Sequence, residues 1–175
     1  TRDRRQRQMC IRDRGKANVE SRFEFIDISF KERILSLYAL KVMSTKNKVP
    51  LTKDEFIEFF ENYFENKTQP IPEDKLEEFL IFLIENTGIL FLKNGKYVQF
   101  KHDSFLEYYC ALEIFKHDRE KEELLIENFF DPNWQNAAIF YAGKSRDMEN
   151  FLRKITDKVK EANNLNNYFL SLIHI

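Results

Sequence analysis

Apolar side chains recur at spacings of three and four residues over three segments of the first half of the chain, which predicts three amphipathic helices. The first extends from Ser29 to about Ser44, the second starts at Thr52, and the third ends at Gly88. We interpret the apolar faces of the second and third helices as core; they are Phe56, Phe59, Phe60, Tyr63 and Phe64, and Leu76, Phe79, Leu80, Leu83 and Ile84.

Short motifs mark the ends of these helices. Ser29 with Glu32, and Thr52 with Glu55, have the spacing of a capping box, in which the first side chain accepts a free helix N–H and the glutamate reaches back. Gly88 can adopt a positive φ and is therefore expected to end the third helix.

The pattern then changes to two short β-prone runs, Ile89–Leu92 and Tyr97–Phe100. Between them lies Asn94-Gly95, which suits a type I′ turn because that turn needs a positive φ at both central residues. A helix from Asp103 to about Lys116 follows. Three helices and a β-hairpin in this order predict a winged helix over residues 29–116.

Three more helices are predicted at residues 120–129, 133–142 and 148–162, with breaks at Asp131-Pro132 and Gly143. They form one α-hairpin and the beginning of another, as at the start of a helical repeat array over residues 117–169. The predicted fold class is therefore mainly α, a winged helix followed by α-hairpins. Such arrays need about three repeats for stability, so the C-terminal helices are expected to fray.

The two ends of the chain differ from the rest. Leu170–Ile175 resembles a translation of one strand of the transposase end sequence used to prepare DNA sequencing libraries, and Met9–Asp13 resembles a translation of the opposite strand. We interpret residues 1–14 and 170–175 as adapter-derived and residues 15–28 as the tail of a preceding domain, so that the chain is a fragment. The alternative is a natural basic tail and a natural apolar C-terminus.

This interpretation changes the charge balance. The full chain has 28 basic and 29 acidic residues, a net charge of −1. Residues 1–14 contain six Arg and two Asp, so the remainder has 22 basic and 27 acidic residues, a net charge of −5. The Arg-rich start therefore does not indicate a nucleic-acid-binding arm.

Composition also bears on location and on chemistry. Cys110, the one cysteine outside the terminal segments, has no intramolecular partner, which favours a reducing, cytoplasmic location. No apolar run reaches the roughly 18 residues of a membrane span, so we expect no membrane. The sequence has no GxxxxGK, GxGxxG, CxxC or HExxH motif and no nucleophile motif. The chain is thus predicted to be no enzyme by itself and to hold no metal or cofactor.

Two side chains are candidates for binding. His102 lies where the second strand ends and the next helix begins. Either it is a surface residue beside a helix capped by Asp103 or Ser104, or it presents a ring N–H to a phosphate. Trp134 is interpreted as a packing residue between helical hairpins, and the alternative is an exposed interaction site for a partner.

The third helix would be the recognition helix of a DNA-binding winged helix. Its charged residues are mostly acidic and would repel phosphate; they are Glu73, Asp74, Glu77, Glu78 and Glu85, against Lys75. Lys93, Lys96 and Lys101 near the hairpin are too few to reverse this repulsion. Nucleic acid is therefore an unfavourable partner.

The segment Phe100-Lys-His-Asp-Ser-Phe-Leu-Glu-Tyr-Tyr-Cys-Ala111 resembles a signature of the NACHT branch of the STAND signal-transduction ATPases, which are NLR-like proteins. That signature, aromatic-x-His-x-Ser-Phe-x-Glu-Phe/Tyr-hydrophobic-Ala, closes their winged-helix domain. Residues 131–143 are similar to the first helical segment that follows it. The resemblance extends from about Phe30 to Asp147.

The resemblance implies a regulatory fragment. In this family an effector, an ATPase core, a winged helix and a sensor array follow one another, and the winged-helix histidine contacts the β-phosphate of bound ADP in the closed state. By the motif match His102 would make that contact, but only with the missing ATPase domain of the same chain, which binds ADP or ATP with Mg²⁺. Sensing of an unknown ligand would then allow nucleotide exchange and homo-oligomerisation, in antiphage defence or innate immunity.

The alternative function is a free-standing winged-helix module that binds DNA or another protein.

Overall fold

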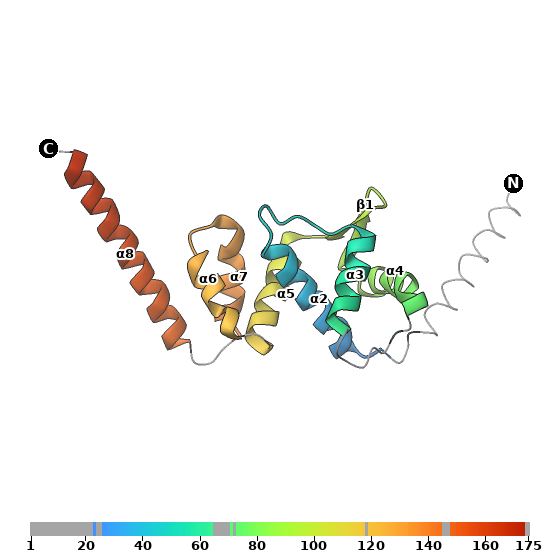
Figure 1. Cartoon of the computed structure of the whole chain (residues 1–175). Helices are drawn as coiled ribbons and strands as arrows, with labels where there is room; N and C mark the ends of the chain where they lie inside the picture. The colour runs from blue at the N-terminus through green and yellow to red at the C-terminus, as the bar shows by residue number, and fades with distance from the viewer. Residues whose placement is uncertain are drawn as a thin grey trace, which may run out of the picture. The chain divides into compact units, whose positions relative to one another are not determined.

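The computed structural model describes residues 23, 26–64, 71, 73–117, 119–144 and 148–173, and it is mainly helical (Figure 1). The first elements are α2 (Ile28–Met43), α3 (Lys53–Phe64), a 3₁₀ turn (Glu73–Lys75), α4 (Leu76–Thr87), β1 (Leu90–Lys93) and β2 (Tyr97–Phe100). They are followed by α5 (Asp103–Lys116), a 3₁₀ turn (Arg119–Lys121), α6 (Glu122–Glu127), α7 (Pro132–Ala142) and α8 (Glu149–Ile173). The predicted mainly α class is confirmed.

The chain divides into two compact units. The first contains residues 1–35 and 45–105, and the second contains residues 36–44 and 106–175. The helices α2 and α5 each contribute to both units, so these units differ from the predicted domains at 29–116 and 117–169. The predicted segment 1–14 lies outside the described residues, as does most of 15–28, and the predicted segment 170–175 overlaps the end of α8 as far as Ile173.

The start of α2 corrects one sequence prediction. The Phe30 N–H donates to Asp27 Oδ1 at 2.6 Å, and the Lys31 N–H donates to the Asp27 carbonyl at 3.3 Å. Asp27 is therefore the N-cap, and the predicted cap Ser29 lies inside the helix. A carboxylate is the better cap because its charge also complements the positive end of the helix dipole.

The capping box at the start of α3 is confirmed. Thr52 Oγ1 accepts from the Glu55 N–H at 3.3 Å, while Glu55 Oε2 accepts from the Thr52 N–H at 2.7 Å and from the Thr52 hydroxyl at 2.8 Å. The hydrogen bonds from the Thr52 backbone and side chain hold the pKa of Glu55 below its usual value.

A cluster of aromatic rings forms the core of the first unit. Phe79 of α4 is 1% exposed, and its ring centroid lies 5.3 Å from that of Phe60, 6.1 Å from that of Phe30 and 5.7 Å from that of Phe23. The predicted apolar faces of α3 and α4 are largely buried, because Phe56, Phe60, Leu76, Leu80 and Leu83 are each at most 3% exposed. The ring contacts join α2, α3 and α4.

The predicted turn residues adopt the required conformations. Gly88, with φ of 63°, ends α4, and its N–H donates to the Ile84 carbonyl at 3.3 Å. Asn94 and Gly95 have φ values of 55° and 66°. The hairpin loop is one residue longer than a two-residue turn, because Lys93 pairs with Tyr97 across it.

The hairpin also pairs with the chain before α3. Thr52 and Tyr97 form an isolated antiparallel bridge. The Val98 N–H donates to the Leu51 carbonyl at 2.9 Å, and the Lys53 N–H donates to the Lys96 carbonyl at 3.0 Å. These bonds extend the two-stranded sheet by a short third segment at the start of α3.

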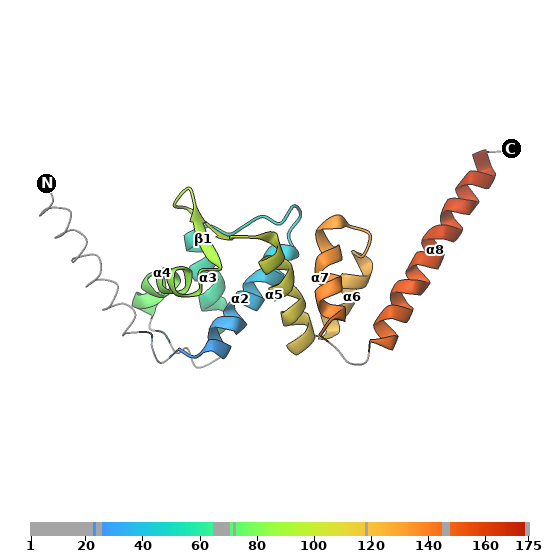
Figure 2. The ribbon, with the colours of Figure 1, turned by 180° about the vertical axis from the view of Figure 1, so that it is seen from behind.

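In the second unit, α6 and α7 lie side by side, as Figures 1 and 2 show. Asp131 caps α7 by accepting from the Asn133 N–H at 2.9 Å, with Pro132 in the first turn. The helix α6 is shorter than the predicted 120–129, and α8 runs beyond the predicted end at 162. The sequence after Gly143 contains neither Gly nor Pro, the residues that commonly end a helix, which is consistent with the greater length of α8.

We expect substitutions of Asp27 and of Ser29 to lower the free energy of unfolding by different amounts. Replacing Asp27 by Ala should lower the free energy of unfolding by about 1 kcal/mol, because a helix N–H loses its acceptor. Ser29→Ala, inside the same turn, should have a much smaller effect. Urea denaturation of both variants measures the difference, and an equal loss in the two would contradict the assignment of the cap.

The lowered pKa of Glu55 predicts a pH-dependent contribution to stability. A carboxyl group with a depressed folded-state pKa stabilises the fold above its unfolded pKa, and this contribution is lost as the pH falls through the folded pKa. The melting temperature of Glu55→Gln should therefore lie below that of the unsubstituted chain at neutral pH. The gap should narrow progressively as the pH falls below the ordinary pKa of a glutamate. Glu58→Gln, exposed on the same helix, is the matched control, and a gap at Glu55 that persists in acid would refute the prediction.

Candidate functional site

The backbone holds His102 from both sides. Phe100 ends β2 and is 5% exposed, and the Lys101 N–H donates to the Ile89 carbonyl at 2.9 Å, one residue beyond the strand pair. The helix α5 begins at Asp103, and the His102 carbonyl accepts from the Phe105 N–H at 3.0 Å. His102 is therefore the junction between hairpin and helix, as predicted.

The imidazole of His102 is exposed and lies beside another exposed ring. Its centroid is 5.8 Å from that of Phe105, with the two planes at 56°, and Phe105 is 37% exposed. Among the described residues the imidazole has this ring contact and no hydrogen-bond partner. The sequence reasoning missed Phe105 as a neighbour of His102, although their spacing of three residues at a helix start could have indicated it.

One interpretation of the sequence expected Asp103 or Ser104 to cap α5, and the contacts among the described residues do not show such a cap. Asp103 and Ser104 are exposed, and within the described part of the chain neither side chain accepts a hydrogen bond from the backbone of this turn. A helix N-terminus with free N–H groups favours an anion. The Asp103 carboxylate acts in the opposite direction, because it would repel a bound anion.

Lys101 contributes its charge elsewhere. The Lys101 ammonium group lies near Gly88, at the C-terminal end of α4. Its Nζ would be 3.9 Å from a Cβ atom built on that glycine. The negative end of the helix dipole stabilises a cation at that position. The charge of Lys101 therefore complements α4, next to the residue that holds His102.

The later residues of the motif join α5 to α7. Glu107 is only 4% exposed, and its Oε2 accepts from Asn136 Nδ2 at 3.1 Å. The Tyr108 ring lies edge-on to Phe140 at 5.8 Å, and Lys144 Nζ lies 4.1 Å from the Tyr108 centroid. The sequence reasoning missed the pair of Glu107 and Asn136. A glutamate among the apolar core positions of α5 indicates that a buried polar partner is needed, but the sequence does not identify which residue this partner is.

Trp134 is 7% exposed and belongs to the buried face of α7, together with Ala137, Ala138 and Tyr141. This burial favours the packing interpretation. The indole offers little surface to a partner.

The acidic residues of α4 and of the turn before it are partly paired with lysines. Lys53 Nζ lies 3.0 Å from Glu77, and Lys75 Nζ lies 3.5 Å from Asp74 and 3.3 Å from Glu78. The side chain of Glu73 lies outside the described residues. Lys93 and Lys96 are exposed at the hairpin turn, and Lys96 Nζ lies 5.3 Å from the Tyr97 centroid. The helix surface is thus less acidic than the sequence alone indicates, but its net charge remains negative.

Because its side chain is exposed, His102 should matter little to folding. Replacing His102 by Ala should change the free energy of unfolding by less than about 0.5 kcal/mol. Leu106→Ala, one turn later at a side chain that is 4% exposed, should cost about 2–5 kcal/mol. Chemical denaturation compares the two, and a large loss for His102→Ala would show that the residue has a structural role.

Among the described residues no group of three or more His, Cys, Asp or Glu side chains could hold a metal ion. In the same part of the chain no helix combines the length and the apolar character needed to cross a membrane. Comparison of the sequence with protein-family models, with curated proteins and with solved structures gave no match.

Proposed function

We propose that the chain is a regulatory part of a NACHT-type signal-transduction ATPase, comprising its winged helix and the start of its sensor array. The observation that carries the proposal is the exposed imidazole of His102, held between the hairpin and α5 inside the segment that resembles the family signature. In the complete protein this imidazole would donate a hydrogen bond to the β-phosphate of ADP and stabilise the closed state.

The arrangement of the first unit supports a winged helix. The helices α2, α3 and α4 precede the hairpin, and the bridge between Thr52 and Tyr97 adds a strand-like segment between α2 and α3. The hairpin leads directly into α5, so the wing and the helix that follows it are joined at His102.

The first turn of α5 supports a phosphate contact. Its N–H groups favour negative charge, and an exposed imidazole can donate to a phosphate oxygen. The nucleotide, ADP or ATP with Mg²⁺, would be bound mainly by the ATPase domain of the same chain. The given sequence contains no GxxxxGK phosphate-binding loop, so nucleotide hydrolysis would require the ATPase domain.

The contacts of α5 with α7 support a link to the sensor array. Glu107 and Tyr108 follow Phe105 by two and three residues and contact Asn136 and Phe140 of α7. One helix would therefore begin at the nucleotide contact and continue along the first sensor helices. Ligand sensing would release the contact and permit homo-oligomerisation, in a cytoplasmic protein of antiphage or innate defence.

The first test is the gene that encodes the chain. We expect a GxxxxGK phosphate loop upstream of Gly15 in the complete reading frame. A complete protein that lacks this motif would refute the proposal.

The second test uses that complete protein. His102→Ala should weaken ADP binding roughly ten- to a hundredfold, since a hydrogen bond to a charged group contributes about 1.5–3 kcal/mol. It should also raise the fraction of oligomer without stimulus. His117→Ala, directly after the C-terminal end of α5, is the matched control and should retain ADP. Calorimetry and size-exclusion chromatography measure the two effects, and an unchanged ADP affinity in His102→Ala would remove this residue from the site.

The alternative function, a free-standing winged-helix module that binds DNA, can be tested by measuring DNA binding to the chain itself. We expect no specific binding at physiological salt, because the α4 surface is acidic overall. Salt-dependent binding that is lost on replacing Lys93 and Lys96 by Gln would favour that alternative.

A further inference from the structure

The helix α8 is attached to the rest of the second unit by few side chains. Among its described side chains, residues 149–163, only Phe151 is buried, at 2% exposure. The Phe151 ring packs on Tyr141 of α7, with the centroids 4.9 Å apart. Beyond its first turns α8 runs away from α6 and α7 (Figures 1 and 2).

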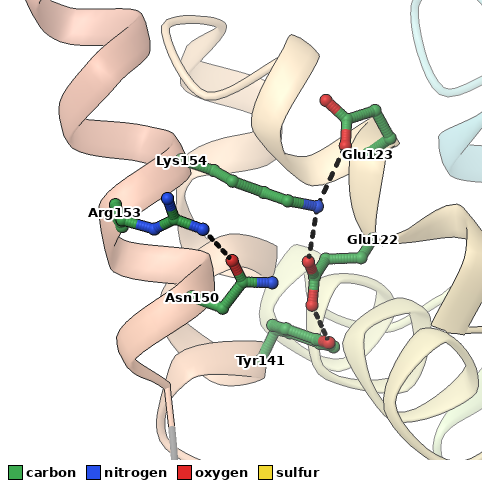
Figure 3. Close-up of polar contacts among 6 residues, drawn as sticks. All are labelled: Glu122, Glu123, Tyr141, Asn150, Arg153 and Lys154. Atoms are coloured by element: carbon green, nitrogen blue, oxygen red, sulfur yellow. Dashed lines mark hydrogen bonds and ion pairs between the residues drawn. The ribbon is translucent and has the colours of Figure 1, made fainter.

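A polar network lies beside this ring contact. Figure 3 shows Lys154 of α8 reaching toward two carboxylates of α6, with its Nζ 3.3 Å from Glu122 Oε1 and 3.3 Å from Glu123 Oε2. The Tyr141 hydroxyl donates to the other oxygen of Glu122 at 2.6 Å. The hydrogen bond to Glu122 raises the pKa of Lys154, and burial together with Glu122 raises the pKa of Tyr141. The lysine is therefore charged and is shared by two acids.

The remaining described part of α8 is not buried. Ile155, Val159 and Ala162 have helical spacing and intermediate exposure. Lys160 pairs with Asp157 of the same helix at 3.6 Å, so this ion pair does not join α8 to another element. Among the described residues, Phe151 supplies the buried side chain of α8, and Lys154 supplies ion pairs from α8 to α6.

The other helices of the unit have a core of their own. Leu125 and Ile126 of α6 and Ala137 of α7 are buried, and Tyr141 also contacts Phe115 of α5, with ring centroids 6.1 Å apart. Separation of α8 would expose Phe151 and one side of Tyr141. It would leave the contacts of α5, α6 and α7 in place.

We infer that α8 is a detachable arm, held at its base by an ionic latch in which Lys154 bridges Glu122 and Glu123. Side-chain exposure is 39% for Lys154 and 57% for Glu123, so water and salt reach the latch. Ion pairs of this kind are weak and are screened by salt. Ionic strength therefore shifts the equilibrium between attached and detached α8.

The test measures the distance between α7 and α8 in the full chain. Nitroxide labels are placed at Gln135 and Glu161, both exposed, in a Cys10→Ser background in which Cys110 is buried. Double electron–electron resonance should give one main distance at low salt. At about 1 M NaCl a second, longer and broader population should grow.

The variants separate the latch from general charge effects. Lys154→Met should raise the ratio of detached to attached α8 at least about threefold at low salt and remove most of the salt dependence. Lys160→Met, which removes the same charge from the same helix, should match the unsubstituted chain.

Circular dichroism checks that the variants keep their helical content. If Lys154→Met loses helix, Glu123→Gln tests the same inference, because it removes only one exposed carboxylate; we expect a smaller rise in the detached population. A distance distribution that is unchanged by salt in the unsubstituted chain, or equal in Glu123→Gln and the unsubstituted chain, would overturn the inference.

Discussion

The candidate site depends on the backbone hydrogen bonds on either side of His102. The bond from Lys101 N–H to the Ile89 carbonyl holds the end of the hairpin, and the bond from Phe105 N–H to the His102 carbonyl starts α5. Only two residues separate the strand from the helix, so the backbone at His102 has little conformational freedom, and its ring lies beside that of Phe105. The position of the His102 backbone is therefore a consequence of local geometry, and its side chain is exposed.

Different interactions stabilise the interior of each compact unit. In the first, the rings of Phe23, Phe30, Phe60 and Phe79 form a continuous aromatic core, which excludes water from the contact of the helices. In the second, Tyr141 has the central position, since its ring contacts α5 and α8 and its hydroxyl donates to α6. The ring contacts of the first unit are apolar, so salt does not screen them. The second includes a charged network at its edge, where the attachment of α8 is weak.

Much of the fold near the site was predictable from the sequence, because it depends on interactions between neighbouring residues. The capping box of Thr52 and Glu55 and the positive φ values at Gly88, Asn94 and Gly95 all occur where predicted. Asp27 shows the limit of such motifs. Two polar residues lay close enough to begin α2, and the carboxylate, which also complements the helix dipole, is the one that accepts the N–H.

By itself the sequence determined the helices, the hairpin turn and the position of His102 between them, because periodicity, caps and turn residues act over a few positions of the chain. The tertiary structure alone decided which distant side chains meet. Glu107 and Asn136 are 29 positions apart, and Lys154 and Glu122 are 32 positions apart. No local pattern specifies such pairs, since they form only when the packing of buried faces brings two helices together. The same packing leaves His102 exposed and buries Trp134.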